Sequence, residues 1–515
     1  LLKQRFSVSV TPDNSKAVLP SDVVILAVKP NVLLPVLRRL DKVVATKLIV
    51  TLPGQTFISG TGNSGTPRVQ TAGTAFGITL TAVDASNNTD VFYNGTKAIS
   101  YSGPGGAPMY TASVTFTSGQ ATSIPTTLTK AEVTVISASD GTRAGLASSS
   151  LTVNAGAFAK LQILTPGETA APGTASGKTG TPAAQLAGTA FSVTVDAVDA
   201  NWNLVNTVVD NVGITSSDAN AVLPSTAALV AGTKSFNVTL RTVGSATVTV
   251  LDITDGTKLA NTSPSITVGG GAFTKLQLLV PGEMAAPGTA SGKTGTPTAQ
   301  PAGTAITVTV NAVDANWNLI NTVTDRVGIT SSDANAVLPP NAVLVGGTKT
   351  FSVTLKTAGT ATITARDITD GGKRPNTSPP ITVNARALGN FLVEAVGGGN
   401  IAPQTMGTAF YIKITARDAY NNTVTGFGGN VWITSNGALL GSCVVSDAFT
   451  AGVLAAHSIT ITSAQVGTTL SATDQASSMS GTSNSFTVNR GGVGNFLVEA
   501  SQGGDISPQT AGAPF

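Results

Sequence analysis

Aspartate and asparagine residues recur at fixed spacing along this chain, and they are the side chains best placed to do chemistry. An Asp followed four residues later by an Asn recurs once in each of four segments, at successive distances of 115, 115 and 104 residues. These pairs are Asp84/Asn88, Asp199/Asn203, Asp314/Asn318 and Asp418/Asn422. A second acidic series keeps the same distances, and its members are Asp140, Asp255, Asp370 and Asp474. Oxygen-bearing side chains in loops either bind Ca²⁺ or accept hydrogen bonds from loop amides.

Both interpretations of these loops apply to each repeat. In the calcium interpretation the two acidic loops approach each other at one end of a domain and supply oxygen ligands, so Ca²⁺ is the one candidate cofactor. In the alternative, Asp and Asn form a latch that bonds the loop's own amides and holds its turn. The latch is favoured, because each loop carries few carboxylates and no D-x-D-x-D-G run occurs. We predict no metal site of the His/Cys type.

Trp202 and Trp317 stand inside the same loops, where the other two repeats carry Asn87 and Asn421. An exposed indole could stack on a sugar ring, which makes these two residues the candidates for ligand stacking. More often such a ring covers the end of a domain or packs against the neighbouring one. We expect packing.

Catalytic groups are missing from the repeated part of the sequence. His457 is the only histidine, so a Ser-His-Asp or Cys-His arrangement cannot recur along the array. We therefore predict no catalytic residue, no cofactor-binding residue and no enzymatic activity for the repeats.

The segment that positions the Asp-Asn loop is residues 187–203, AGTAFSVTVDAVDANWN. Apolar and polar residues alternate along it, which is typical of a half-buried β-strand. A second alternating stretch, KSFNVTL, follows in the same repeat. We expect the inward residues to form the core of the second domain, with matching residues in the third: Phe191, Val193, Val195, Phe236, Val238 and Leu240. No helix of 12 or more residues is expected between 46 and 490.

Composition restricts the remaining classes of protein. A chain of 515 residues is too long for one hydrophobic core, and charged residues make up only 11% of it. The net charge of +3 and the absence of Lys/Arg-rich blocks argue against nucleic-acid binding. Cys443 is the only cysteine, so no intrachain disulfide can form. The longest apolar run, 23–28, is far shorter than a membrane helix requires.

Short alternating segments separated by Gly, Pro, Asn and Asp predict an all-β fold built from sandwiches. The motifs AGTAF-x-VTV-x-AVDA, ITSSDANAVLP and F-x-VTL-[KR]-T, with a closing ITV, resemble the bacterial immunoglobulin-like repeats of large secreted and cell-surface proteins. The resemblance covers residues 46–515. We place the repeats at 46–156, 157–271, 272–386 and 387–490, with the start of a fifth at 491–515.

Residues 6–54 differ from the repeats. The segments SDVVILAVKPNVLLPVLRRL and KLIVTLPG resemble the middle of the nucleotide-binding domain of pyrroline-5-carboxylate reductase. The resemblance implies a βαβ unit in which Val28, Lys29 and Pro30 lie beside a nicotinamide cofactor. No G-x-G-x-x-G turn is present to hold a pyrophosphate. We therefore expect residues 1–45 to be a small, incomplete βαβ fragment, with an NAD(P)-dependent reductase as a remote alternative.

These features together predict an extracellular or cell-surface protein, a stalk or surface-fibre segment of stacked immunoglobulin-like domains with a structural or adhesive role. The alternative is an array of carbohydrate- or protein-binding modules. Expected partners are a surface ligand or another copy of the chain, with no nucleic acid and no transmembrane segment. Residues 492–515 begin a fifth repeat that ends early, so we expect this tail to add to an exposed sheet edge or to lie disordered.

Overall fold

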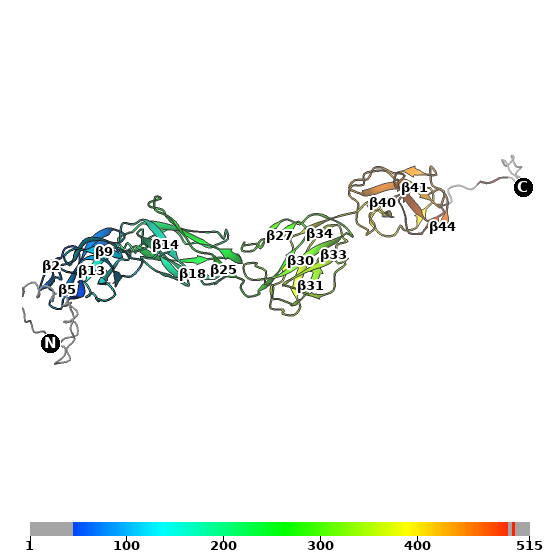
Figure 1. Ribbon diagram of the computed structural model, residues 1–515. Helices are drawn as coiled ribbons and strands as arrows, with labels where there is room; N and C mark the ends of the chain where they lie inside the picture. The colour runs from blue at the N-terminus through cyan, green and yellow to red at the C-terminus, as the bar shows by residue number, and fades with distance from the viewer. Residues whose placement is uncertain (1–44, 493–496, 500–515) are drawn as a thin grey trace, which may run out of the picture. The chain divides into compact units, whose positions relative to one another are not determined.

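The computed structural model describes residues 45–492 and 497–499. Within these residues the secondary structure consists of strands β1 to β47, and no helix is present (Figure 1). The expectation of an all-β fold without long helices is therefore confirmed for the described residues. No helix long and apolar enough to cross a membrane occurs among them. The chain divides into two compact units between Gly271 and Ala272, and each unit is described by itself.

The second repeat shows the architecture most clearly. Three antiparallel strands form one sheet, in the order β14(Lys160–Leu164), β18(Ala190–Val198) and β21(Thr233–Thr239). A four-stranded sheet has the order β20(Ala227–Ala228), β19(Asn211–Ser216), β23(Val248–Asp252) and β24(Asn261–Thr262). A third sheet has the order β17(Gln185–Leu186), β25(Ile266–Gly269) and β22(Gly244–Ala246), and its β17–β25 pair is parallel. The hairpin β15(Glu168–Ala170)–β16(Lys178–Gly180) extends from the long Pro/Gly loop.

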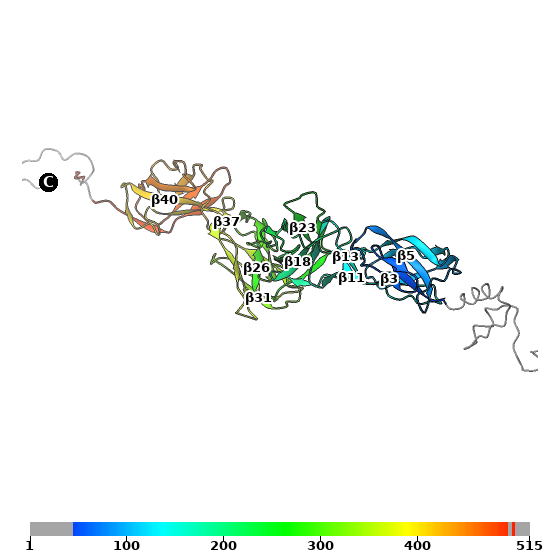
Figure 2. The same cartoon turned by 90° about the vertical axis from the view of Figure 1, so that its left-hand side faces the viewer.

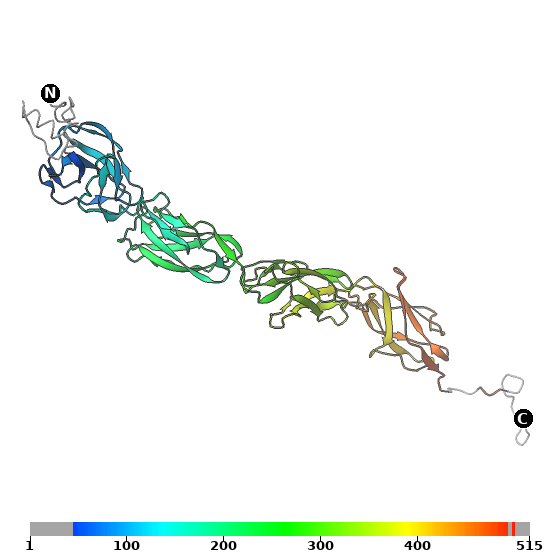
Figure 3. The same ribbon diagram turned by 60° about the horizontal axis from the view of Figure 1, so that its bottom comes forward.

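The third repeat has the same topology. Its sheets are, in strand order, β26(Lys275–Leu279), β30(Ala305–Val313), β33(Thr348–Thr354); β32(Ala342–Val343), β31(Arg326–Ser331), β35(Ile363–Asp367), β36(Asn376–Thr377); β29(Gln300–Pro301), β37(Ile381–Asn384), β34(Gly359–Ala361); and the hairpin β27(Glu283–Ala285)–β28(Lys293–Gly295). The strands of this repeat pair only with one another among the described residues, and Figure 3 draws them in green to yellow.

The fourth repeat keeps the three main sheets and lacks the hairpin. The sheets are β38(Asn390–Ala395), β40(Phe410–Arg417), β43(Val453–Ile459); β42(Val444–Val445), β41(Trp432–Ser435), β45(Leu470–Thr473), β46(Ser480–Thr482); and β39(Gln404–Thr405), β47(Phe486–Asn489), β44(Gln465–Thr468). The missing hairpin accounts for the shorter distance of 104 residues to this repeat, because the first loop is where the sequence is shortened.

The first repeat is the most divergent. Its sheets are β1(Ala45–Thr51), β5(Ala75–Asp84), β10(Gln120–Thr127), β8(Met109–Tyr110); β11(Glu132–Thr134), β13(Leu151–Asn154), β4(Gln70–Thr71); and the pairs β12(Ser137–Ser139)–β7(Ser100–Ser102), β2(Thr56–Ile58)–β3(Gly62–Ser64) and β6(Gly95–Ala98)–β9(Ser113–Phe116). Figure 2 shows β5 and β3 within this repeat. The strand β1 pairs antiparallel with β5, so residues 47–50 belong to this sandwich. Assigning them to a βαβ unit is wrong.

Each repeat has its own hydrophobic core, as the alternating patterns predict. In the second repeat Val193, Val195, Val238 and Leu240 are fully buried, and Phe191 and Phe236 are 8% and 5% exposed. The matching residues of the third repeat are also buried, namely Ile306, Val308, Val310, Phe351, Val353 and Leu355. The predicted inward faces are therefore confirmed in both repeats. The exact boundaries between repeats stay a prediction.

Two predictions fall mostly outside the described residues. The rest of the βαβ fragment, with Val28, Lys29 and Pro30, lies in residues 1–44. The predicted opening strand of a fifth repeat lies in residues 492–515, of which the structure describes only 492 and 497–499. Leu497 and Val498 in that short stretch are exposed and belong to no strand.

Candidate functional site

The Asp199–Asn203 loop begins where β18 ends, and its carboxylate organises the turn. Asp199 Oδ1 accepts hydrogen bonds from the backbone N–H groups of Asn201 and Asn203, at 2.7 and 2.9 Å. Asp199 Oδ2 accepts from Asn203 Nδ2 at 2.9 Å. Asp199 and Asn203 are 0% and 1% exposed. Every oxygen of the buried carboxylate is thus hydrogen-bonded, which favours the latch interpretation of this loop over the calcium interpretation.

The same loop also bonds to the preceding repeat, which the sequence did not reveal. Asn203 Nδ2 donates to the carbonyl oxygen of Thr129 at 2.9 Å, and Asn203 Oδ1 accepts from the N–H of Ala131 at 2.7 Å. Asp199 Oδ2 accepts from the N–H of Gly156, in the segment that links the two repeats, at 2.8 Å. The Asn carboxamide therefore pairs with the backbone just after β10 as a neighbouring strand would.

The second unit repeats this geometry between its own two repeats. Asn422 Nδ2 donates to the carbonyl of Lys356 and Asn422 Oδ1 accepts from the N–H of Ala358, both at 2.8 Å. Asp418 Oδ2 accepts from Asn422 Nδ2 and from the N–H of Arg386, both at 3.0 Å. We use the term Asp–Asn latch for Asp199/Asn203 and Asp418/Asn422 together with these bonds. Backbone hydrogen bonds and its partner Asn422 lower the pKa of Asp418, against the effect of burial, which raises it.

Glycines of the preceding repeat make room for the latch loop. A Cβ added to Gly73 would lie 2.4 Å from Asn201 Nδ2, and one added to Gly303 would lie 2.1 Å from the ring of Tyr420. Both glycines have positive φ, 79° and 72°. Asn201 and Tyr420 occupy the same place in their loops, two residues after the latch Asp. The glycine of the AGT motif therefore leaves room for a side chain of the next repeat at both junctions.

Each of these two junctions has a further contact of its own. Between the first two repeats the carbonyl of Gly173 accepts from Thr129 Oγ1 at 2.8 Å and from the N–H of Ala107 at 3.0 Å. In the second unit, Arg386 at the end of the third repeat donates through its guanidinium to Thr304 Oγ1 of the same repeat at 2.9 Å. Tyr420 also packs against the core of the third repeat. The latch is common to the two junctions, and the additional contacts are not.

In the remaining two Asp-Asn pairs, the asparagine side chain likewise donates to the carboxylate of its own pair. Asp84 Oδ2 accepts from Asn88 Nδ2 at 2.9 Å, and Asp314 Oδ2 accepts from Asn318 Nδ2 at 3.0 Å. Asn88 is exposed, whereas Asn318 is 1% exposed. The pKa of Asp84 is lowered, chiefly by its hydrogen bond from Asn88.

The second acidic series is engaged within its own turns. Asp140 accepts from the Tyr93 hydroxyl at 2.7 Å and pairs with Arg143 at 3.0 Å. Asp255 and Asp370 each lie 3.3 Å from a lysine, Lys258 and Lys373. Asp474 binds Ser477, and the sheet register places it level with Asp367 rather than Asp370, since Leu470 pairs with Ser435 as Ile363 pairs with Ser331. None of the hydrogen bonds described joins this series to the Asp-Asn pairs.

No group of three or more His, Cys, Asp or Glu side chains in the described residues is arranged to hold a metal ion. His457 contacts Asp447, at 3.2 Å.

The two tryptophans pack against their own repeats. Trp202 donates through Nε1 to the carbonyl of Ala175 at 3.2 Å, and Lys160 Nζ lies 3.4 Å from the centroid of its ring. Gly177 contacts the same ring so closely that an added Cβ would lie 2.2 Å from it. Trp317 repeats the arrangement with Ala290, Lys275 and Gly292. A lysine ammonium and a glycine backbone thus lie against each indole ring, which disfavours stacking of a sugar on it.

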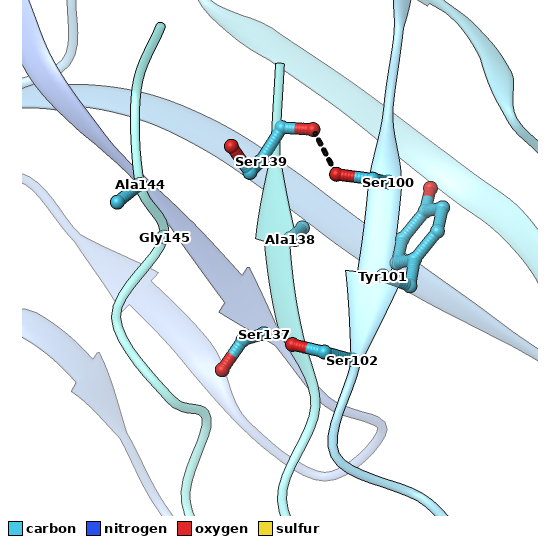
Figure 4. Close-up of a pocket in the computed structure, with 8 residues that line it drawn as sticks. All are labelled: Ser100, Tyr101, Ser102, Ser137, Ala138, Ser139, Ala144 and Gly145. Atoms are coloured by element: carbon cyan, nitrogen blue, oxygen red, sulfur yellow. Dashed lines mark hydrogen bonds between the residues drawn. The ribbon is translucent and has the colours of Figure 1, made fainter. Parts of the chain in front are cut away.

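Two concave surfaces occur in the first unit. A small hollow of about 180 Å³ is lined by serines of β7 and β12 and by the strand-like segment beside them, and Ser100 Oγ donates to the carbonyl of Ser139 at 3.2 Å (Figure 4). A groove of about 730 Å³ lies beside the latch and is lined by residues 131–133, 152–158 and 204–208. Its one charged side chain is Glu132, which pairs with Lys130. Neither surface presents a catalytic group.

The sequence profile of a family described as NADP oxidoreductase, coenzyme F420-dependent, matches residues 1–53, the segment that resembles a reductase. The chain has no significant match among curated protein sequences.

Solved structures similar to this chain include bacterial surface proteins. The adhesin FdeC of Escherichia coli is 20% identical, over 66% of this chain and 99% of its own, with a TM-score of 0.26. Invasin, a bacterial integrin-binding protein, is 17% identical over 86% of this chain and 79% of its own, with a TM-score of 0.25. Domains 1–6 of the surface layer protein SbsC are 15% identical over 93% and 62%, with a TM-score of 0.17.

Proposed function

We propose that this chain is a segment of an extracellular stalk or surface fibre, in which the Asp–Asn latch stiffens the junctions between immunoglobulin-like repeats. The observation that carries the proposal is the pair of hydrogen bonds from one carboxamide to the backbone of the preceding repeat, present at Asn203 and again at Asn422. A stalk holds what it carries at a distance, which requires that neighbouring domains resist bending.

The latch suits this task because its asparagines hydrogen-bond only to backbone atoms of the preceding repeat. The residues that supply the carbonyl are Thr129 and Lys356, and they share no side-chain chemistry. Repeats can therefore diverge at these positions while the junction keeps its geometry. The bonds are almost fully buried, so water does not compete for them.

Surface display tests the proposed role. The full chain, placed between a bacterial membrane anchor and an epitope tag, should hold the tag at a uniform height above the cell. The double variant Asn203→Ala, Asn422→Ala should be displayed in equal amount, with the tag at a more variable height. The matched variant Asn88→Ala alters the exposed asparagine of an Asp-Asn pair outside the latch and should behave as the wild type. Equal height distributions for all three proteins would refute a stiffening role.

A binding-module role is the second candidate, and the groove beside the first latch favours it. The same displayed chain, washed over glycan and extracellular-matrix protein arrays, should give no signal if it serves only as a stalk. Retention that is lost on Val133→Asp, a change at a 69% exposed groove residue, would assign binding to the groove instead.

A further inference from the structure

A pair of aspartates outside both Asp series lies at the edge of the four-stranded sheet. Asp252 is the last residue of β23 and pairs with Val212 of β19, so Asp210, two residues before Val212, lies diagonally beside it at the end of the sheet. Asp252 is 7% exposed. Its Oδ1 accepts from the N–H groups of Thr254 and Asp255, both at 2.9 Å, whereas its buried Oδ2 has no hydrogen-bond donor.

The third repeat contains the same arrangement. Asp367 ends β35, is 8% exposed, and pairs with Val327 of β31, two residues after Asp325. Its Oδ1 accepts from the N–H groups of Thr369 and Asp370, and its Oδ2 is again buried without a donor. A buried carboxylate oxygen without a donor, with a second carboxylate beside it, is stabilised by a positively charged group or a proton.

The other two repeats lack the pair. In the sheet register Gly213 pairs with Leu251, and the corresponding pairs are Ser100 with Ser139 and Trp432 with Thr473. Asp210 lies three residues before Gly213. The residues three positions before Ser100 and Trp432 are Lys97 in the first repeat and Gly429 in the fourth. The first and fourth repeats keep an acid at the place of Asp252, but Asp140 bonds to Tyr93 and Arg143 and Asp474 bonds to its own turn. Among the described repeats, the acid at the place of Asp252 has a buried Oδ2 without a donor only where the second acid is also present.

The charges around the pair favour a divalent cation over a proton. A third acid, Asp255, acts electrostatically on Asp210, and it pairs with Lys258 at 3.3 Å. Three carboxylates and one ammonium leave a net charge of −2. Asp325, Asp367, Asp370 and Lys373 give the same sum in the third repeat. One divalent cation neutralises this charge, and one proton does not.

We propose that Asp210 and Asp252, and likewise Asp325 and Asp367, bind a divalent cation of the calcium type, one in each repeat. All donor atoms offered are oxygens, which suits Ca²⁺, and backbone carbonyls and water complete such a coordination sphere. These residues differ from the Asp-Asn pairs and do not contact the junction of the first two repeats described above, so the proposal stands independently of the stalk function.

Calorimetric titration of the full chain with CaCl₂ tests the proposal. The wild type should bind two ions, with Kd on the order of 10⁻⁴ to 10⁻³ M as is typical of extracellular modules, and its unfolding temperature should rise with Ca²⁺. Asp210→Asn should lower the number of sites from two to one, and Asp210→Asn with Asp325→Asn should abolish binding. The matched control Asp474→Asn should keep both sites.

Three outcomes would overturn the proposal. Absence of both heat and thermal shift in the wild type would exclude a cation site. Unchanged stoichiometry in the folded double variant would place binding elsewhere. Loss of binding in Asp474→Asn would do the same. Circular dichroism of each variant confirms that it is folded.

Discussion

At the scale of single residues, the asparagine of the latch is the side chain with the most defined role. Asn203 uses both amide hydrogens and its oxygen, and each bond joins a different group: Asp199, the carbonyl of Thr129 and the N–H of Ala131. Aspartate cannot donate and alanine can do neither, so no other common side chain of this size supplies the set.

Asn203→Ala should therefore destabilise the first unit by about 2–3 kcal/mol, because it leaves the carbonyl of Thr129 and the N–H of Ala131 without this partner and removes one bond to Asp199. Calorimetric unfolding of the full chain measures the change. The control is Asn88→Ala, where the asparagine is exposed, and its cost should be below about 1 kcal/mol. Equal costs at the two positions would mean that the inter-repeat bonds add nothing.

A second residue-scale prediction concerns Asp196 on β18. Burial raises the pKa of Asp196, although the Thr233 hydroxyl donates to its carboxylate. The third repeat has Asn311 at this position, whose Nδ2 donates to Gln277 Oε1 at 3.0 Å. Because the folded pKa exceeds the unfolded one, the free energy of unfolding should rise as pH falls through the folded pKa, until both states are protonated below the ordinary value of 3.8.

Asp196→Asn should remove this pH dependence and stabilise the second repeat at neutral pH. Thermal unfolding at a series of pH values checks it. The reciprocal variant Asn311→Asp should introduce the same dependence in the third repeat. If Asp196→Asn loses stability at pH 7, the carboxylate makes a favourable contact that this account omits.

At the scale of elements, the paired strands β18 and β21 carry the core of the second repeat. Phe236→Ala should cost about 3–5 kcal/mol, because the ring is 5% exposed and its removal leaves a cavity. Val230→Ala, at a 68% exposed position, serves as the control and should change stability by no more than about 0.5 kcal/mol. Chemical denaturation compares them, and a loss below 1 kcal/mol for Phe236→Ala would contradict the observed packing.

These strands also show how far the sequence alone could go. Alternation in AFSVTVDAV fixes which face is buried, because successive side chains of a strand point to opposite faces. The reductase resemblance misleads for residues 47–50, because a short apolar run fits a parallel or an antiparallel strand equally well and these residues pair with β5 of the first repeat. Fixed spacing also misaligned Asp474 with Asp370, because a turn of different length shifts the register.

The candidate site was only half predictable. The Asp-Asn pattern indicated a loop held by its own side chains, and the structure has that loop. The inter-repeat bonds end on backbone atoms of Thr129, Ala131 and Gly156, and backbone atoms leave no residue type to recognise. The Asp210/Asp252 pair was detectable in principle, because both acids occur in the two closely matching repeats and not in the other two.

At the scale of the whole molecule, the central claim is that side-chain bonds to backbone atoms hold adjacent repeats at a fixed angle. The claim concerns the junction of the first two repeats and that of the last two. A junction held only by a covalent linker samples many angles. A junction with three buried hydrogen bonds and a glycine packed against the next repeat samples few.

Double electron–electron resonance spectroscopy, which measures the distance between spin labels on the first two repeats, tests this claim most directly. The labels go on Val91→Cys and Val209→Cys, at exposed positions, with Cys443→Ser removing the native thiol. The distance distribution should be narrow in this background and should broaden when Asn203→Ala is added, while Asn88→Ala leaves it narrow. A distribution that is equally broad in all three proteins, or one that stays narrow after Asn203→Ala, would contradict the account.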